Sequence, residues 1–507
     1  MGLRRARVTG KALAAAMLAA AGSLVSAVAL AAESHEGLSP CWLDGVPQQV
    51  LCGVVSRPLN PSRTDGVRID IHFAVLPALA RNRLPDPVFF LAGGPGQSAI
   101  DLAGSISRLL ARLNNRRDVV LVDQRGTGRS APLLCPVPPP TAPLAEAAGT
   151  AQQVARVRRC REQLQTLPHG DLRHYTTPVA MADLDAVRRR LGADRIDLVG
   201  GSYGTRAVLE YMRQFPQAVR RAVIDGVAPP DMVLPVAASL DNQGALDAVF
   251  AACAAEPACQ SRHPELQADW RRLLARLPLQ VRVLHPVTGA AENLTVTHDL
   301  VLSLVRGPLY APALAAALPQ AIADAAAGRF DPLLGLSSVL TPRRGGHIAE
   351  GMHFSVICSE DVQSPNDAGS ALKVGADFGS AFAGVYVSIC ADWPHAELPA
   401  GFRTLPPALV ATLVLSGGAD PVTPPRHGAR VTQALGALAR HVVVPQAGHG
   451  LLALPCLRDV LWRFIDADTD TAALQVDANC AAGVPRPPAV VSLVATLPSA
   501  SASGSRR

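Results

Sequence analysis

The amino-acid sequence predicts an α/β fold in which a mostly parallel sheet is flanked by helices and carries a large helical insertion. Two observations predict it. Short apolar runs with turn residues at their ends alternate with helix-like segments up to Pro230, and two more such runs follow residue 400. Near-continuous apolar runs are typical of strands covered on both faces, as in a parallel sheet.

The strand-like runs are rich in aliphatic or aromatic residues and are bounded by turn residues; they span residues 87–94, 117–126, 195–201, 220–230, 408–425 and 440–450. A helical pattern, MADLDAVRRRLGA, begins at Met181, with acids early, arginines late and Gly192 near its end. This charge order matches the helix dipole, and glycine commonly ends helices. Asp183 and Asp185 are therefore expected at a helix start rather than in catalysis.

The chain changes character after Pro230. From Asp231 to about Ala400 it is rich in Ala and Leu with helical periods, and no strand–glycine–helix unit recurs. The tail is rich in Ala, Ser and Pro, a composition typical of loose segments. We therefore expect a signal peptide at residues 1–31, a first part of the core at 32–230, a helical cap at 231–400, a C-terminal part of the core at 401–480, and a flexible tail at 481–507.

The N-terminus predicts export. Basic residues from Arg4 to Lys11 precede an Ala-rich apolar run, and Ala29-Leu30-Ala31 is a small-x-small cleavage site. The expected location is secreted or periplasmic, without a stable membrane anchor; an uncleaved anchor is the alternative. This leader supplies four of the six net positive charges, and the rest of the chain has no Lys/Arg stripe, so nucleic-acid binding is not expected.

All ten cysteines lie beyond the leader, and an even number in an exported chain indicates disulfides. Spacing alone does not fix their connectivity, and reduced thiols are the alternative. Pairing neighbours in the sequence joins Cys41 with Cys52, Cys135 with Cys160, Cys253 with Cys259, Cys358 with Cys390, and Cys456 with Cys480. Paired C-x-x-C motifs are absent, and neither a metal nor an organic cofactor is expected.

The strongest chemical signal is Ser202, in Gly200-Gly201-Ser202-Tyr203-Gly204. It follows the strand-like IDLVG and precedes the helix-like TRAVLEYM. A G-x-S-x-G pattern at such a turn presents a nucleophilic hydroxyl, and small neighbours let the strained backbone fit. A tight turn without chemistry is the alternative.

A serine hydroxyl needs a base, and after this kind of turn the acid and then the base follow in the chain. Asp420 in GGADPVTPP and His449 in PQAGHGLL each follow a strand-like run, where open α/β sheets place their sites. We expect His449 to move the proton and Asp420 to orient the imidazole. The backbone N–H groups of Tyr203 and of Gly94, in the GGPG loop, are the expected oxyanion donors; a plain turn is the alternative for the loop.

Five segments carry a family resemblance, in the order GGPGQS, VDQRGTGRS, GGSYGTR, GGADPVTP and AGHG. They resemble the α/β-hydrolase serine peptidases of the prolyl and tripeptidyl aminopeptidase family, the tripeptidyl branch more closely, over about residues 41–480. The resemblance implies an α/β-hydrolase fold, a triad of Ser202, Asp420 and His449, and a peptide substrate. One departure is Ala92, where prolyl aminopeptidases usually carry a histidine.

The resemblance also makes a cap carboxylate the expected partner of the substrate's ammonium group. Glu360, beside Asp361 in MHFSVICSEDVQS, is the expected group, and an ordinary solvated acid pair is the alternative. Asp123 and Arg125 are expected to brace the loop beneath the site. The expected function is an exported serine exopeptidase that removes N-terminal units from peptides. A serine esterase with the same triad and a non-catalytic binding protein are the alternatives.

Overall fold

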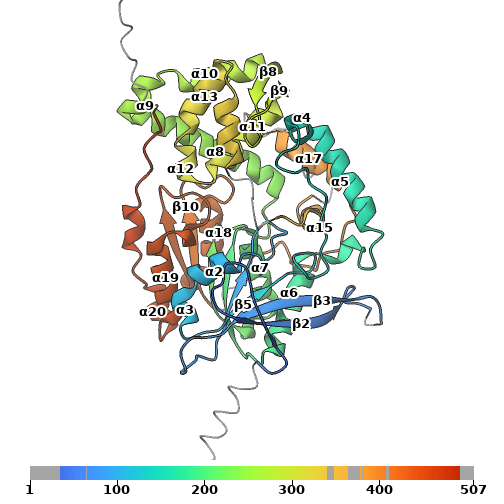
Figure 1. Ribbon diagram of the computed structural model, residues 1–507. Coiled ribbons are helices and arrows are strands. Elements are labelled where there is room, and N and C mark those ends of the chain that lie inside the picture. Colours follow the sequence, from blue (N-terminus) through green and yellow to red (C-terminus); the bar gives the residue numbers. More distant parts are fainter. Residues whose placement is uncertain are drawn as a thin grey trace, which may run out of the picture.

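The computed structural model describes residues 35–63, 65–339, 347–362, 377–379, 381–406 and 410–491. The expected signal peptide and the last part of the expected tail lie outside these residues. Figure 1 shows two lobes stacked on each other, the core below and the cap above.

A nine-stranded sheet forms the centre of the core, in the order β1-β2-β3-β5-β4-β6-β7-β10-β11. The core strands are β1 (Ser39–Cys41), β2 (Val50–Pro58), β3 (Arg68–Leu76), β4 (Val88–Leu91), β5 (Val119–Val122), β6 (Ile196–Gly201), β7 (Val219–Asp225), β10 (Ala411–Gly417) and β11 (Ala439–Val444). The strands from β1 to β3 pair antiparallel, as do β3 and β5, and the remaining pairs from β5 to β11 are parallel. The expected mostly parallel sheet is confirmed.

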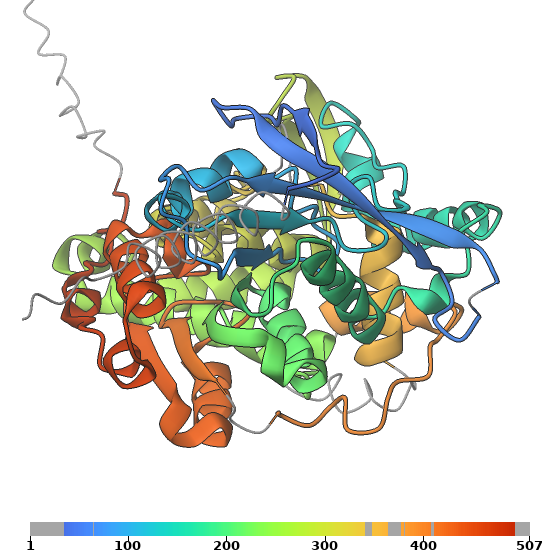
Figure 2. The same ribbon diagram turned by 90° about the horizontal axis from the view of Figure 1, so that it is seen from below.

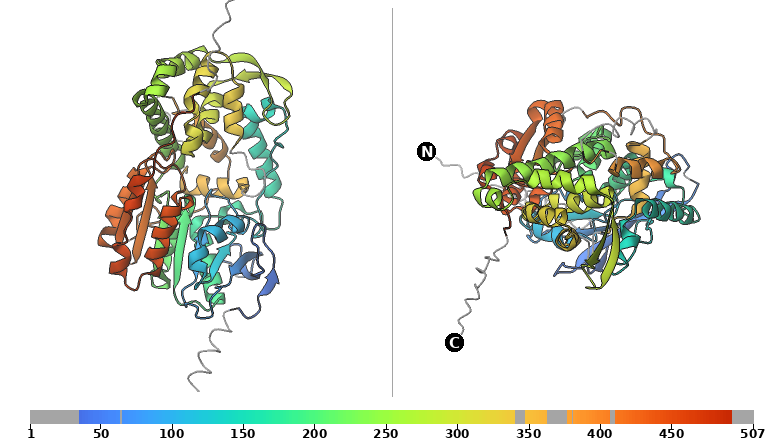
Figure 3. Two further views of the ribbon diagram at one scale, coloured as in Figure 1. Left: turned by 60° about the vertical axis from the view of Figure 1, so that its left-hand side comes forward. Right: turned by 90° about the horizontal axis from the view of Figure 1, so that it is seen from above.

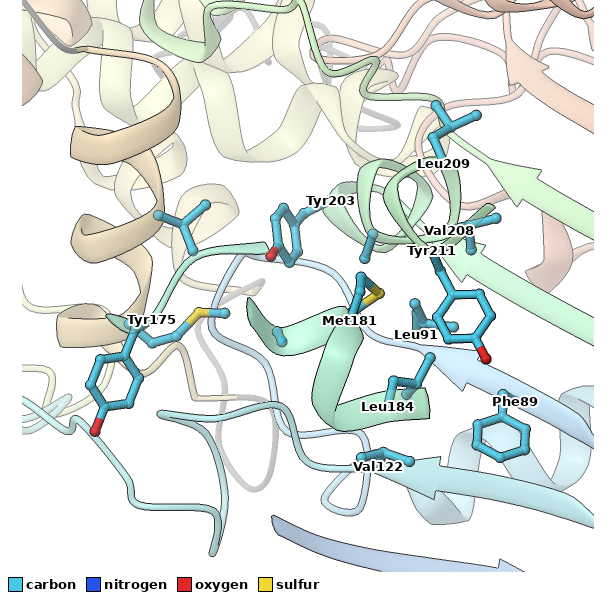
Figure 4. Close-up of a cluster of buried hydrophobic side chains, with 14 of the residues drawn as sticks. Phe89, Leu91, Val122, Tyr175, Met181, Leu184, Tyr203, Val208, Leu209 and Tyr211 are labelled. Atoms are coloured by element: carbon cyan, nitrogen blue, oxygen red, sulfur yellow. The ribbon is translucent and has the colours of Figure 1, made fainter. Parts of the chain in front are cut away.

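Helices cover both faces of this sheet because alternate strand residues point to opposite sides. In β4, Phe89 and Leu91 belong to one buried cluster, whereas Val88 and Phe90 belong to the other. The helices on the Phe89 face are α6 (Thr177–Arg190), α7 (Tyr203–Gln214) and α18 (Pro425–Leu435); those on the Val88 face are α2 (Ala103–Leu109), α3 (Ala111–Asn114), α19 (Pro455–Asp466) and α20 (Asp470–Leu474). Figure 4 shows Leu184 of α6 in the same cluster as Leu91 of β4 and Tyr211 of α7, and Figure 2 shows the molecule from below.

The cap lies between β7 and β10 in the chain and has its own core, which includes Leu246, Trp270 and Leu304. Its helices are α8 (Leu234–Ala255), α9 (Pro257–Arg262), α10 (Leu266–Arg276), α11 (His298–Leu309), α12 (Pro312–Ala315), α13 (Leu318–Ala326), α14 (Asp331–Ser338), α15 (Glu350–Glu360) and α17 (Ala381–Cys390). It also contains an antiparallel hairpin, β8 (Leu279–Leu284) and β9 (Ala291–Val296), so the cap is not the purely helical unit that the sequence indicates. Two earlier helices, α4 (Leu144–Ala148) and α5 (Thr150–Leu164), pack against β9 and α17.

The cap is tied to the rest of the chain at several points. The described end of the tail reaches it, since the N–H of Ala489 donates to the Glu256 carboxylate over 3.0 Å and that of Val490 to the Ala316 carbonyl over 2.9 Å.

All five expected disulfides are present, and the fourth links α15 to α17. Figure 3 shows the cap and the core from two further sides. Within the described ranges, no helix is long and apolar enough to cross a membrane.

Candidate active site

Ser202 lies in the turn between β6 and α7 and has a strained backbone, with φ of 56° and ψ of −125°. Non-glycine residues rarely adopt a positive φ, so the fold must hold this turn in place. The flanking glycines allow it: a Cβ on Gly200 would lie 2.5 Å from the Gly204 carbonyl oxygen, and one on Gly204 would lie 2.1 Å from the Leu91 carbonyl oxygen. The turn therefore presents the Ser202 side chain where strand and helix meet.

Asp420 and His449 follow β10 and β11, and the structure brings them into contact. Oδ2 of Asp420 lies 2.7 Å from Nδ1 of His449. The Thr423 hydroxyl donates to the same oxygen over 2.7 Å and lies 3.1 Å from Nδ1 of His449. The other carboxylate oxygen accepts the N–H groups of Val422 and Thr423, each over 2.9 Å. A carboxylate held by four such contacts fixes the imidazole with Nδ1 protonated and leaves Nε2 as the base.

The charges of this pair favour an ion pair between the Asp420 carboxylate and a protonated His449. Burial lowers the pKa of His449, but the charge of Asp420 and its hydrogen bond outweigh burial and raise that pKa above its ordinary value. Burial raises the pKa of Asp420, and the same contact with His449 lowers it below its ordinary value. The imidazolium produced by proton transfer is therefore stabilised next to its carboxylate.

The turn after β7 connects Ser202 to His449. The N–H of Ser202 donates to the carbonyl of Asp225 over 2.9 Å, and the Asp225 carboxylate accepts the N–H groups of residues 451 and 452 over 3.0 and 2.9 Å. A Cβ on the intervening Gly226 would lie 3.1 Å from Cε1 of His449. Across the described part of the chain no hydrogen bond joins the Ser202 hydroxyl to the His449 ring; such bonds often tighten only when substrate is bound.

The two residues expected to supply oxyanion donors lie beside Ser202. Gly94, Tyr203 and Ser202 all line one cavity. Tyr203 is the first residue of α7, so its N–H has no acceptor within the helix and lies at the positive end of the helix dipole. Gly94 has φ of 110°, and a Cβ on the preceding Gly93 would lie 3.2 Å from the Cβ of Ser202. The GGPG loop therefore packs directly on the serine.

The cavity beside Ser202 has a volume of about 90 Å³ and is bounded by both lobes. Its walls include Arg206 from α7, Tyr310 at the end of α11, Asp361 at the end of α15 and Tyr386 from α17. A larger hollow of about 550 Å³ lies elsewhere, beside Asp86 and Arg220, but its lining contains neither serine nor cysteine. Ser202 lines the smaller cavity together with Thr423, which contacts both Asp420 and His449, so that cavity is the candidate active site.

The structure separates the roles of the two neighbouring cap acids. Glu360 accepts hydrogen bonds from the N–H and the hydroxyl of Thr177, over 2.6 and 3.0 Å, and lies 3.4 Å from Nη1 of Arg206. Asp361 accepts from the same nitrogen of Arg206 over 2.9 Å and lines the cavity. The backbone N–H of Leu234 also donates to the Asp361 carboxylate, and Oδ2 of Asp361 is buried without a hydrogen-bond partner among the described residues.

Burial affects both acids. It raises the pKa of Glu360 to about 7, although Arg206 and Thr177 oppose the shift. It also raises the pKa of Asp361 against the opposing charge of Arg206. The side chains of all three charged residues are at most 4% exposed. Arg206 therefore pairs directly with two buried carboxyl groups at the wall of the cavity, and the charge of Arg403 also acts on Asp361.

Sequence reasoning missed several residues around the triad. The Tyr310 ring packs edge-on against the His449 ring, with centroids 5.4 Å apart. The backbone carbonyl of Tyr310 accepts a hydrogen bond from the backbone N–H of His449 over 3.0 Å. Thr423 lies in GGADPVTP, three residues after Asp420, so its position was a usable signal, whereas Tyr310 lies in the cap, far from the other site residues in the sequence. Asp225 had a usable signal, because it ends a strand-like run at the edge where sites gather.

The expected bracing by the VDQRGTGRS segment is confirmed. Asp123 accepts hydrogen bonds from the Ser98 hydroxyl over 2.6 Å and from the N–H of Ile100 over 3.1 Å. Arg125 is buried and donates two hydrogen bonds to Asp183, over 2.7 and 2.9 Å. These contacts fix the segment that follows the GGPG loop and the first residues of the loop after β5. Neither residue lines the cavity beside Ser202.

Known proteins resemble this chain over most of its length. A family described as the alpha/beta hydrolase fold matches residues 86–454. Serine protease Hip1 of Mycobacterium tuberculosis is 28% identical over 419 residues, which cover 76% of this chain and 78% of the relative. The tripeptidyl aminopeptidase of Streptomyces lividans is 30% identical over 219 residues, 40% of this chain and 41% of the relative. The proline iminopeptidase of Xanthomonas citri is 25% identical over 171 residues, 33% of this chain and 41% of the relative.

The matched span contains the nucleophile turn, the acid–base pair and the whole cap. It covers well over half of the chain, and the relatives described above are a serine protease and two aminopeptidases by name. The chain therefore belongs to the α/β-hydrolase family, and within it is a serine hydrolase of the peptidase kind.

Proposed function

We propose that the protein is an exported aminopeptidase that uses Ser202 to release a short unit from the N-terminus of a peptide. The observation that carries this proposal is the Asp361 carboxylate, which lines the cavity of Ser202 and has one buried oxygen without a partner. The free ammonium group of a peptide would supply that partner through a charge-assisted hydrogen bond. The names of the peptidase relatives support the substrate class.

The charges around Arg206 support a cationic ligand. When Glu360 and Asp361 are both ionised, Arg206 is their only direct ion-pair partner among the described residues, and the charge of Arg403 acts on Asp361 from beyond ion-pair distance, so the two buried carboxylates are incompletely compensated. An uncompensated buried charge is costly, so binding a cation there is favourable. We assign the direct contact to Asp361, while Glu360 contributes its charge from behind, because Thr177 and Arg206 occupy its oxygens.

The proposed reaction proceeds through an acyl-enzyme. Ser202 Oγ attacks the carbonyl carbon as Nε2 of His449 takes its proton, and the N–H groups of Gly94 and Tyr203 stabilise the oxyanion. The C–N bond then breaks and the imidazolium gives its proton to the leaving amine. Water attacks the ester in the same way, which releases the N-terminal unit with a new carboxylate and restores Ser202.

Export is part of the proposal. The leader at residues 1–31 and the five disulfides support it, because disulfides persist in oxidising compartments. N-terminal sequencing of the protein from the culture medium or periplasm is expected to give a chain that begins at Ala32. An intact leader on that protein would contradict this part.

The decisive experiment is a panel of aminoacyl, dipeptidyl and tripeptidyl p-nitroanilides, each with a free and an acetylated N-terminus. We expect kcat/KM for the best substrate to fall at least about 100-fold on acetylation, because the charge that meets Asp361 is lost. The Ser202→Ala variant controls for contaminating peptidases. Equal cleavage of acetylated substrates would overturn the ammonium anchor, and turnover of p-nitrophenyl esters alone would identify an esterase.

A further inference from the structure

The cap helix α15 contacts the GGPG loop at two of its carbonyl groups. The N–H of Ala349, directly before the helix, donates to the Gly96 carbonyl over 2.9 Å. One turn later, Nδ1 of His353 lies 3.1 Å from the Pro95 carbonyl oxygen. A carbonyl can only accept a hydrogen bond, so the proton of the His353 ring is on Nδ1.

The other nitrogen of the same ring is held by the cap. Nε2 of His353 lies 2.9 Å from the hydroxyl of Tyr386, on α17. A neutral imidazole that carries its proton on Nδ1 accepts at Nε2, so the Tyr386 hydroxyl is the donor. Burial lowers the pKa of His353, which favours this neutral form. The ring is thus fixed between the loop and a second cap helix.

The loop depends on such contacts for its shape. Gly94 and Gly96 have φ of 110° and 107°, a region that glycine enters freely and other residues avoid. A Cβ on Gly96 would lie 2.9 Å from the Ala349 carbonyl oxygen, so the loop packs directly on the start of α15. Glycine is conformationally permissive, so the two contacts from the cap restrict a loop whose own sequence restricts it little.

We propose that His353 is a positioning residue of the oxyanion hole. It holds the Pro95 carbonyl so that the N–H of Gly94, one residue earlier, points to the place of the substrate's carbonyl oxygen. The inference rests on the proposed oxyanion role of Gly94, but not on the aminopeptidase specificity. The cap is then a part of the catalytic machinery as well as a cover, because an oxyanion donor acts only when it is aimed correctly.

Three substitutions separate the two hydrogen bonds of His353. In His353→Asn, the side-chain amide nitrogen takes the place of Nδ1 and retains the bond to Pro95. In His353→Gln, the amide reaches the place of Nε2 and retains only the contact with Tyr386. His353→Phe keeps a ring of similar shape and loses both bonds.

The first measurement is kcat and KM for p-nitrophenyl acetate, whose hydrolysis needs the oxyanion hole but no ammonium anchor. We expect kcat to fall about 10- to 100-fold in His353→Phe and His353→Gln, because loss of a whole donor costs about 10²–10³. KM should change little in both. His353→Asn should stay within about threefold of the wild-type kcat, since the neutral bond it loses to Tyr386 does not touch the loop.

The second measurement is inhibition by phenylboronic acid, whose adduct with serine is tetrahedral and resembles the intermediate. Its Ki should weaken by the same factor as kcat/KM across the three variants. If His353 had a purely structural role, all three variants would have a lower melting temperature, and Ki would not change in parallel with kcat/KM. Equal losses of kcat in the Asn and Phe variants, or a loss confined to KM, would overturn the inference. If the variants hydrolyse p-nitrophenyl acetate as expected but the protein cleaves no peptide amide, only the aminopeptidase proposal is contradicted.

Discussion

The hydroxyl of Thr423 lies 2.7 Å from Oδ2 of Asp420, the oxygen that also contacts the His449 ring. Hydrogen bonds to a charged group contribute about 1.5–3 kcal/mol, so Thr423→Val is expected to lower kcat/KM about 10- to 100-fold. Thr423→Ser keeps the hydroxyl and is the matched control. Steady-state kinetics on the best amide of the panel test this, and wild-type kinetics in the valine variant would contradict it.

The pH dependence of kcat/KM follows from the raised pKa of His449. The free imidazole is the base, so activity is lost as the pH falls through that pKa, and the acid limb should have its midpoint above the ordinary value of 6.5. In Asp420→Asn, the residual activity should have a lower midpoint, because burial then acts on the imidazole without the opposing carboxylate. A wild-type midpoint below 6.5 would be inconsistent with the geometry.

The two cap acids can be distinguished by isosteric variants. Asp361→Asn should raise KM for substrates with a free N-terminus about 10- to 100-fold, which matches the value of a charge-assisted hydrogen bond. Glu360→Gln should have a smaller effect, because Thr177 already occupies the Glu360 oxygens. Hydrolysis of p-nitrophenyl acetate serves as the control reaction in both. A larger effect of Glu360→Gln would assign the contact with the substrate's ammonium group to Glu360.

The glycines of the nucleophile turn differ in their tolerance of a methyl group. Gly204→Ala would place a Cβ 2.1 Å from the Leu91 carbonyl oxygen, whereas a Cβ on Gly201 meets nothing within 4 Å. We expect Gly204→Ala to lower the free energy of unfolding by about 3 kcal/mol or more, as overpacking of a rigid core does. Gly201→Ala should fold like the wild type. Thermal unfolding followed by circular dichroism compares them, and equal stability would refute this account.

The positions of Ser202, Asp420 and His449 after core strands were predictable because their signals are local. Ser202, Asp420 and His449 each follow an apolar strand-like run and lie among small turn residues, and parallel strands bring their C-terminal ends to one edge. Asp183 shows the limit of local reasoning. The helix begins at Thr177 rather than near Met181, so Asp183 lies within it and binds Arg125 from a distant loop. Only the three-dimensional contact reveals that partner.

The cap was the least predictable part for the same reason. The β8 and β9 segments do alternate in polarity, but they are short and lie in a long stretch with helical periods. The choice between Glu360 and Asp361 depends on how the end of α15 faces the cavity, because adjacent helical residues point in different directions. That rotation is fixed by packing against Thr177 and Arg206, which the sequence separates by more than 150 residues from both acids.

The disulfide between Cys358 and Cys390 has a consequence for where the enzyme can work. It ties together the two helices that hold His353 and Tyr386, and Cys358 precedes the acid pair by only two residues. A newly made chain in a reducing cytosol lacks this covalent link. We therefore expect such a chain to be inactive as a peptidase until the disulfide has formed. Peptides inside the producing cell would then not be cleaved.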